Sequence, residues 1–238
     1  MVTAMEKTGI PKFDTHRIYY WDDAELVGTH MLPRLEPQQL IPHDVISFNE
    51  RNTVRDPSGH WLDFFVDDVQ FESCWNQFER GVVCDSSEEH DVWRLVDRYL
   101  PQLARFEGVI GTDYSMFPEM LPDQRNWNCA RNRVFAYRMQ RNGIPCVPVA
   151  SWSCKEDWEW CFDGLPEESS VAVSTNGCCR RAESRSVLRA GIDELTRRKS
   201  PYAVIICGRC LPEFEGCKAN LVFYRSFSQR MRGRSNGR

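Results

Sequence analysis

Hydrophobic residues follow different patterns in the two parts of this chain of 238 residues. Residues 1 to 60 show no sustained period and are interrupted by prolines, so we expect a Pro-punctuated extension that packs on the core and adds short edge elements. From Trp61 onward, short apolar runs with strand character alternate with segments of helical spacing. The predicted strands are 61–66, a weak one at 81–84, 108–112, 146–151, 171–175, 202–207 and 221–224, and the predicted helices are 89–104, 127–142, 154–162 and 184–199.

This alternation predicts an α/β fold built from repeated βα units. Short strands that alternate with helices pair in parallel through right-handed crossovers. Six or seven such strands favour a mostly parallel sheet that forms an incomplete or irregular (β/α) barrel, and a doubly wound open sheet is the alternative. The expected divisions are the extension 1–60, a βα core domain 61–226, and a disordered Arg-rich tail 227–238.

The composition is typical of a globular protein, with 42% hydrophobic and 27% charged residues. No apolar run approaches the ~20 residues that a membrane helix needs, and no stretch resembles a signal peptide, so we expect a cytoplasmic protein without a membrane partner. Eleven cysteines without the spacing of a disulfide scaffold should stay mostly reduced. The last 59 residues carry 14 basic against 5 acidic side chains, which would add attraction to a polyanion.

Acidic and hydroxyl residues follow several of the predicted strands. Ligands of parallel α/β folds bind at the carboxyl ends of the strands, where loops and helix N-termini converge. We therefore predict a pocket in which Asp113 and Asp68 supply carboxylates for acid/base chemistry or for Mg²⁺. The alternative is that each Asp only caps the turn or helix that follows it. The residues predicted to bind the ligand are Ser115, Asn128, Arg131, Trp152, Ser174 and Asn176.

The segment 125–133, which opens the predicted helix 127–142, combines Asn side chains with three arginines. It is either an anion site, at which Asn128 and Arg131 would contact a phosphate, or an N-cap followed by a solvated basic face. Cys207 and Cys210 form one C-x-x-C pair without a second pair, so we predict no metal site. The sequence has neither a Gly-rich phosphate loop nor a G-x-S-x-G motif, and all five histidines lie at or before residue 90. Acid/base chemistry would therefore fall to carboxylates.

Three short motifs occur in order along the core: G-x-D-Y-S at 111–115, N-x-x-R-N at 128–132 and G-I-P-x-x-P-x-x-S-W at 143–152. In these motifs the chain resembles an uncharacterised family of bacteriophages and bacterial mobile elements, the domain of unknown function numbered 4417. The resemblance covers about residues 62 to 210. It implies a phage or mobile-element setting in a bacterial host cell, and it brings no established activity, cofactor or catalytic residue.

These observations lead to hypotheses of different classes. In the first, the protein acts on or binds nucleotides or nucleic acid through the strand-end pocket, with Trp152 stacked on a base or sugar. In the second, it is a non-catalytic binder that sequesters a nucleotide signal or inhibits a host defence protein. A carboxylate-dependent hydrolase acting on a sugar is a third hypothesis, which a barrel would permit.

Overall fold

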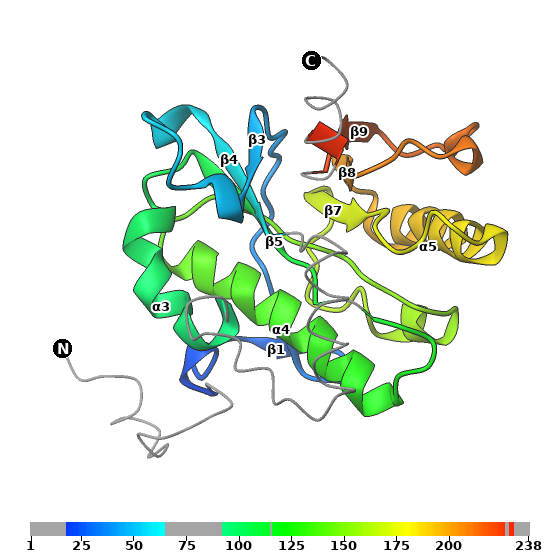
Figure 1. The fold of residues 1–238 in the computed structure, drawn as a ribbon. Coiled ribbons are helices and arrows are strands. Elements are labelled where there is room, and N and C mark those ends of the chain that lie inside the picture. The colour runs from blue at the N-terminus through cyan, green and yellow to red at the C-terminus, as the bar shows by residue number, and fades with distance from the viewer. Residues whose placement is uncertain (1–17, 65–91, 115, 227–228, 231–238) are drawn as a thin grey trace, which may run out of the picture.

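The computed structural model of the protein describes residues 18–64, 92–114, 116–226 and 229–230 (Figure 1). The weak strand predicted at 81–84 lies outside the described residues, as do Asp68 and Ser115. The described α-helices are α3 Val92–Leu103, α4 Pro122–Arg141 and α5 Ala182–Lys199. The described strands are β1 Leu26–Val27, β2 Leu32–Pro33, β3 Val45–Ser47, β4 Trp61–Phe64, β5 Gly108–Thr112, β6 Cys146–Val147, β7 Ser170–Ser174, β8 Ala203–Cys207 and β9 Leu221–Tyr224.

Seven of these strands run parallel and follow one another in chain order. One sheet has the order β3-β4-β5-β6 and a second has the order β7-β8-β9. A parallel bridge between Val149 and Ala172 connects the two sheets, and the Ala150 amide donates to the Ala172 carbonyl over 2.9 Å. The prediction of an α/β fold with mostly parallel strands is confirmed.

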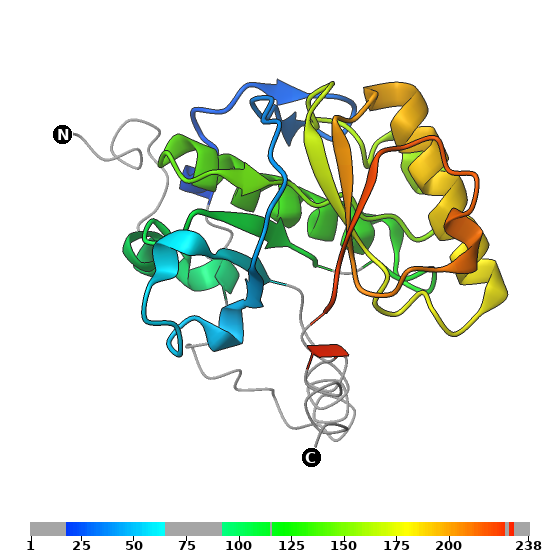
Figure 2. The same ribbon diagram turned by 90° about the horizontal axis from the view of Figure 1, so that it is seen from above.

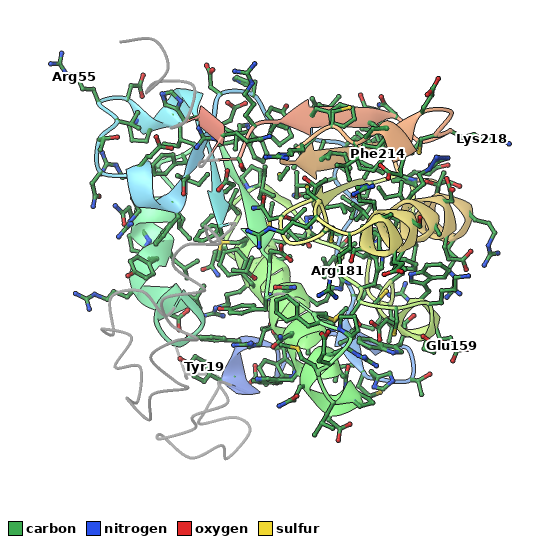
Figure 3. The ribbon with its side chains drawn as sticks, turned by 45° about the vertical axis from the view of Figure 1, so that its right-hand side comes forward. Tyr19, Arg55, Glu159, Arg181, Phe214 and Lys218 are labelled. Carbon is green, nitrogen blue, oxygen red and sulfur yellow. The ribbon has the colours of Figure 1, made fainter. Side chains whose placement is uncertain are left out.

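The helices cover one side of the strands (Figures 1 and 2). α4 contacts β5 and β6, and α5 turns a buried stripe toward β7 and β8 with Leu188, Ile192 and Leu195. At the far edge Phe214, labelled in Figure 3, lies 5.9 Å from the ring of Phe223 in β9. Within the described part of the chain, no helix combines the length and the apolar character that a membrane span requires.

The opposite side of the strands forms a second, smaller core. In β8, Val204 and Ile206 face the helices, whereas Ala203, Ile205 and Cys207 face this inner side. The inner side chains of β3 to β8 belong to one buried cluster, against which the side chains of β9 also pack. The strands are therefore buried on the side away from the helices as well as on the side that the helices cover.

The observed start of α4 differs from the predicted one, whereas its end agrees. α4 begins at Pro122, five residues before the predicted position, because proline suits the first helical turn and the Leu121 amide donates to Gln124 Oε1 over 3.0 Å. At the other end Gly143 adopts φ +71°, and the Ile144 amide donates to the Met139 carbonyl over 3.0 Å. This is the glycine stop that the Asn-Gly pair predicts.

The predicted helix at 154–162 is wrong. A single 3₁₀ turn, η4 Glu156–Glu159, occupies this region. Asp157 Oδ2 accepts hydrogen bonds from the amides of Ser153 (2.8 Å) and Cys154 (3.3 Å), which ties the chain into a turn ahead of η4. An Asp side chain that binds nearby backbone amides competes in this way with helix formation.

The first part of the chain reaches the core as a hairpin and an edge strand. β1 and β2 pair antiparallel, and β2 packs on α4 with Leu32 fully buried. The Leu35 amide donates to the Gly164 carbonyl over 2.9 Å, and β3 pairs in parallel with β4. The extension therefore covers α4 and completes one edge of the sheet.

Candidate functional site at the strand ends

A β-bulge in β5 determines where Asp113 points. Between its pairings at Val109 and Thr112, β5 has one residue more than the facing stretch of β4. Val109 faces the helices, and Thr112 does so too, because its Oγ1 donates to Asn132 Oδ1 of α4 over 3.1 Å. Regular alternation would also have turned Asp113 to the helices. The extra residue instead directs it to the inner side, and bulges commonly re-aim side chains in this way.

Hydroxyl groups from neighbouring strands hold the Asp113 carboxylate. Ser151, just after β6, donates from Oγ to Asp113 Oδ1 over 2.9 Å, and Ser174 at the end of β7 provides a second hydrogen bond. Burial raises the pKa of Asp113 and outweighs these two bonds, which lower it. A carboxyl group whose pKa moves toward neutrality is suited to general acid/base chemistry.

Asp63 of β4 lies on the same inner side. It is 4% exposed and follows Trp61 by two positions, so the two side chains share a face. Burial raises the pKa of the Cys207 thiol, and the nearby charges of Asp63 and Asp113 raise it further. Ser47 pairs with Asp63 in register, as Ser174 pairs with Cys207. We call these residues the strand-end cluster: Ser47, Asp63, Asp113, Ser151, Ser174 and Cys207.

Asn132 fixes the chain on both sides of Asp113. Besides accepting from Thr112, its Oδ1 accepts from the Tyr114 amide over 2.8 Å, and its Nδ2 donates to the Tyr114 carbonyl over 3.3 Å. Asn132 is 2% exposed, so these bonds do not compete with water. The guanidinium of Arg131 stacks on the Tyr114 ring at 3.8 Å from its centroid. Two adjacent residues of α4 thus orient the segment that carries Asp113.

An ion pair connects the strand ends with the segment after β9. Arg230 Nη2 lies 2.7 Å from Glu50 Oε2, and both side chains are about four-fifths buried. The same Glu50 oxygen accepts the Ser47 amide over 3.0 Å. Arg230 is close enough to lower the pKa of Cys207. Arg230 belongs to the tail predicted to be disordered, yet the structure gives it defined contacts.

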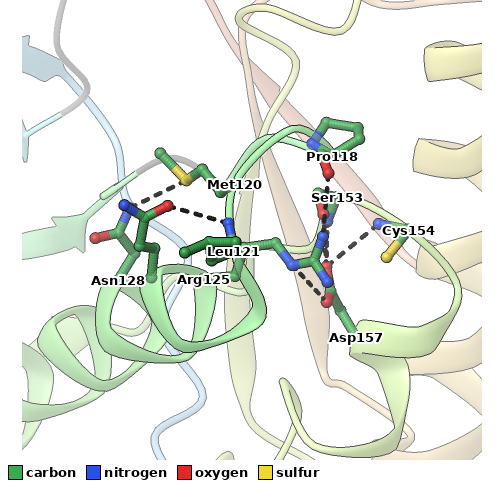
Figure 4. A network of polar contacts seen from close by, with 9 residues as sticks. Pro118, Met120, Leu121, Arg125, Asn128, Ser153, Cys154 and Asp157 are labelled. Carbon is green, nitrogen blue, oxygen red and sulfur yellow. Dashed lines mark hydrogen bonds and ion pairs between the residues drawn. The ribbon is translucent and has the colours of Figure 1, made fainter.

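A second polar network orders the loop after β6 (Figure 4). Arg125 Nε of α4 lies 3.2 Å from Asp157 Oδ1, and both groups are almost completely buried. The other Asp157 oxygen accepts the amide and the hydroxyl of Ser153, each over 2.8 Å. Because Ser153 follows Ser151 by two residues, this network supports the position of a strand-end hydroxyl.

The segment 125–133 is not the helix N-terminus that the sequence predicts. α4 starts at Pro122, so Asn126 and Asn128 lie inside the helix and are not N-caps. Arg133 is fully buried and donates to the carbonyls of Cys161 and Asp163, each over 3.0 Å. Asn128 Oδ1 accepts from Arg131 Nη2. These internal contacts remove the argument for an anion site at a helix start.

Trp152 has a packing role at the strand end. Its Nε1 donates to the Val187 carbonyl over 3.2 Å, and its ring lies 5.7 Å from that of Phe162. A Cβ at Gly191 of α5 would come within 2.3 Å of the Trp152 ring nitrogen, so the indole fills the space that this glycine leaves. Trp152 and Asp113 follow neighbouring parallel strands, which places them at the same end of the sheet as predicted.

The strand-end cluster can exchange a proton with a ligand and can offer two carboxylates to a cation. Cys207, whose raised pKa keeps it a neutral thiol, is a poor nucleophile. Within the described ranges, no group of three or more His, Cys, Asp or Glu side chains is arranged to hold a metal ion. The nine cysteines that the structure describes are free thiols.

The structure brings together Asp113 and Ser174 of the predicted site and adds residues that the sequence analysis missed. Asp63 interrupts the apolar run of β4, and an acid within a buried strand was a signal for it. Asn132 closes the N-x-x-R-N motif, but its bonds to residues 112 and 114 have no local sequence signal. Asn176 lies beside the cluster, where its amide donates to Ser174 Oγ over 3.1 Å.

Comparison with known proteins relates the chain to phage proteins. A family model described as "Domain of unknown function (DUF4417)" matches residues 81–225, more than half of the chain. Gene 1 protein of Mycobacterium phage D29 is 29% identical over 184 residues, which cover 76% of this chain and 62% of that protein. Gene 1 protein of Mycobacterium phage L5 is 27% identical over 187 residues, or 78% and 74% of the two chains. These matches confirm the predicted family.

The aligned part spans less than two thirds of the D29 protein. No solved structure matches the chain.

Proposed function

We propose, from the premise that the chain belongs to the family of the domain of unknown function DUF4417, that this phage-associated protein acts on a nucleotide or nucleic acid through its strand-end cluster. Asp113 is the proposed acid/base group and Asp63 the proposed second carboxylate, which together could bind Mg²⁺. Asp68 and Ser115 stay sequence predictions for the same site. The proposed location is the cytoplasm of the bacterial host.

The observation that carries this proposal is the environment of Asp113. A β-bulge aims it at the inner side, one serine after β6 and one at the end of β7 bind it, and burial raises its pKa. An Asp that only capped a turn would be bonded to nearby amides, and its pKa would be lowered, as Asp56 shows with Ser58. The sequential order of the parallel strands, the bridge between their two sheets and the shared inner core further support our proposal that the strands form an incomplete (β/α) barrel with this cluster at its mouth.

The choice of a nucleotide rests on charge and setting. Arg230 places a guanidinium near Cys207, and the last 59 residues have an excess of nine positive charges. A phosphate-bearing ligand is the natural counter-ion for such a region. Arg131 and Asn128 stay sequence predictions for ligand contacts, since the start of α4 at Pro122 removes the helix-start argument for them.

The test compares the wild type with Asp113→Asn and with Asp193→Asn, a matched control at an exposed carboxylate of α5. Both proteins are incubated with ribo- and deoxynucleotides and with labelled single- and double-stranded DNA, with and without Mg²⁺. Products are followed by chromatography and binding by calorimetry. Asp113→Asn should lower turnover by at least about 10²-fold, the usual share of a general acid or base, while Asp193→Asn should not.

Stability against pH gives an independent readout. The raised pKa of Asp113 means that its ionised form costs folding free energy above that pKa, and that this cost disappears as the pH falls below it. Asp113→Asn should therefore be at least as stable as the wild type at pH 8, with a smaller advantage at pH 4. Full turnover by Asp113→Asn would contradict the catalytic role of Asp113. Binding without turnover by the wild type would favour the hypothesis of a non-catalytic binder.

A further inference from the structure

A cavity separate from the strand-end cluster lies between the N-terminal hairpin and the first turns of α4. Its volume is about 430 Å³, within the range of small-molecule sites. The hairpin and the turn before it contribute Trp21, Leu26, His30, Met31 and Pro33, and α4 contributes Asp123, Asn126, Trp127, Ala130 and Val134.

Two polar groups of this cavity, the Asp123 carboxylate and Asn126 Oδ1, are hydrogen-bond acceptors. Asn126 Oδ1 is buried and has no hydrogen-bond partner within the described part of the chain. Asp123 takes part in none of the ion pairs that the described residues form. The described lining contains neither Lys nor Arg. A buried acceptor without a donor costs free energy, so a ligand that donates N–H groups to it would supply the hydrogen bond that the described residues do not provide.

The electrostatics of the cavity favour a cation. The N-terminus of α4 carries a partial positive charge of about half a unit, which the full negative charge of Asp123 in the same turn outweighs. The indoles of Trp21 and Trp127 line the cavity, and the Trp127 ring already lies 5.9 Å from a cation, the Arg131 guanidinium, on which aromatic quadrupoles exert attraction. An anion such as a phosphate would meet the Asp123 carboxylate and no Lys or Arg in the described lining.

From these observations we propose that the cavity between the hairpin and α4 binds a small organic cation, an amidinium, guanidinium or ammonium group on a flat apolar body. The charged head hydrogen-bonds to Asp123 and Asn126 Oδ1. The apolar body packs between the indoles and Ala130. This site is independent of the nucleotide proposed for the strand-end cluster and has the opposite charge preference.

Benzamidine, benzamide and benzoate test this proposal, because they share one shape and differ in charge. Binding to the full chain is measured by calorimetry and by ligand-observed NMR at pH 7. Benzamidine should bind with a dissociation constant on the order of 1 mM, as expected for a fragment of this size. Benzamide should bind at least 5-fold more weakly, and benzoate should not bind at 10 mM.

Variants locate the binding in the cavity. Asp123→Asn, an exposed position whose change leaves packing intact, should weaken benzamidine at least 5-fold and leave benzamide within 2-fold. Glu183→Gln, the matched control, removes the acid from the first turn of α5 and should change neither. Ala130→Phe fills the cavity and should abolish binding of both. Equal affinity for the three probes, no binding of benzamidine at 10 mM, or unchanged benzamidine affinity in Asp123→Asn would each overturn the proposal.

Discussion

Asn132 connects the helix layer with the segment that carries Asp113, and Asn132→Ala tests that connection. The substitution removes three hydrogen bonds, from Thr112 Oγ1 at 3.1 Å, from the Tyr114 amide at 2.8 Å and to the Tyr114 carbonyl at 3.3 Å. At roughly 0.5–1.5 kcal/mol for each bond, the free energy of unfolding should fall by about 2–4 kcal/mol. For a chain of this size the melting temperature should fall by about 5–15 °C.

The same substitution should change the ionisation of Asp113. Once residues 112 and 114 are released, water reaches the carboxylate, and the pKa of Asp113 should drop from its raised value toward the ordinary 3.8. Carbon-13 NMR titration of the carboxyl carbons, assigned by comparison with Asp113→Asn, measures this pKa. We expect the pKa to fall because burial is the largest cause of its raised value, and the substitution reduces that burial.

Leu195→Ala is the matched control. Leu195 is fully buried on α5, and its truncation should cost a similar 2–5 kcal/mol while leaving the residues around Asp113 in place. The pKa of Asp113 should therefore stay raised in this variant. If the pKa stayed raised in Asn132→Ala as well, or if stability fell by less than about 1 kcal/mol, Asn132 would not hold the segment and the reasoning would be refuted.

Two further predictions concern the ion pairs around the site. Asp157→Ala leaves the Ser153 and Cys154 amides and Arg125 without the carboxylate that binds them, so it should lower the free energy of unfolding in urea titration by roughly 3–5 kcal/mol. Arg125→Ala should lower it by only about 1–2 kcal/mol, because Asp157 still accepts hydrogen bonds from the two amides. Equal losses in the two variants would contradict this order. Arg230→Met should cost about 0.5–1 kcal/mol, and less in 1 M NaCl. A loss that is independent of salt would show that packing, not the pair with Glu50, accounts for it.

The fold followed from the sequence where local pattern and tertiary packing agree. The predicted strands 108–112 and 221–224 coincide with β5 and β9, because short apolar runs bounded by polar or turn residues have few alternatives to a strand. β3 has three residues, too few for any period, and exists because β4 offers it a parallel partner. The failed helix at 154–162 has the reverse cause, since Asp157 binds the amides that a helix would have used.

The candidate site was predictable only as far as position along a strand determines position in space. Parallel strands bring their carboxyl ends together, so the meeting of Asp113 with Ser151 and Ser174 follows from the strand assignments. The direction in which Asp113 points does not, because one extra residue in β5 reverses it. The role of Asn132 could not be predicted either, because its hydrogen-bond partners depend on how α4 packs on β5.

The cost of Asp113 to the fold is the strongest reason to treat it as functional. Two serine hydroxyls beside it need an acceptor, and the amide oxygen of an asparagine would serve them without carrying a charge. The chain instead has a carboxylate there, burial of which outweighs both hydrogen bonds and raises its pKa. Asp63 and Cys207 lie on the same inner side, and the charges of both acids raise the pKa of the Cys207 thiol. Packing alone would favour neutral groups at these positions. An arrangement that keeps ionisable groups at the expense of stability is therefore best explained by a ligand or reaction that uses their protons or their charge.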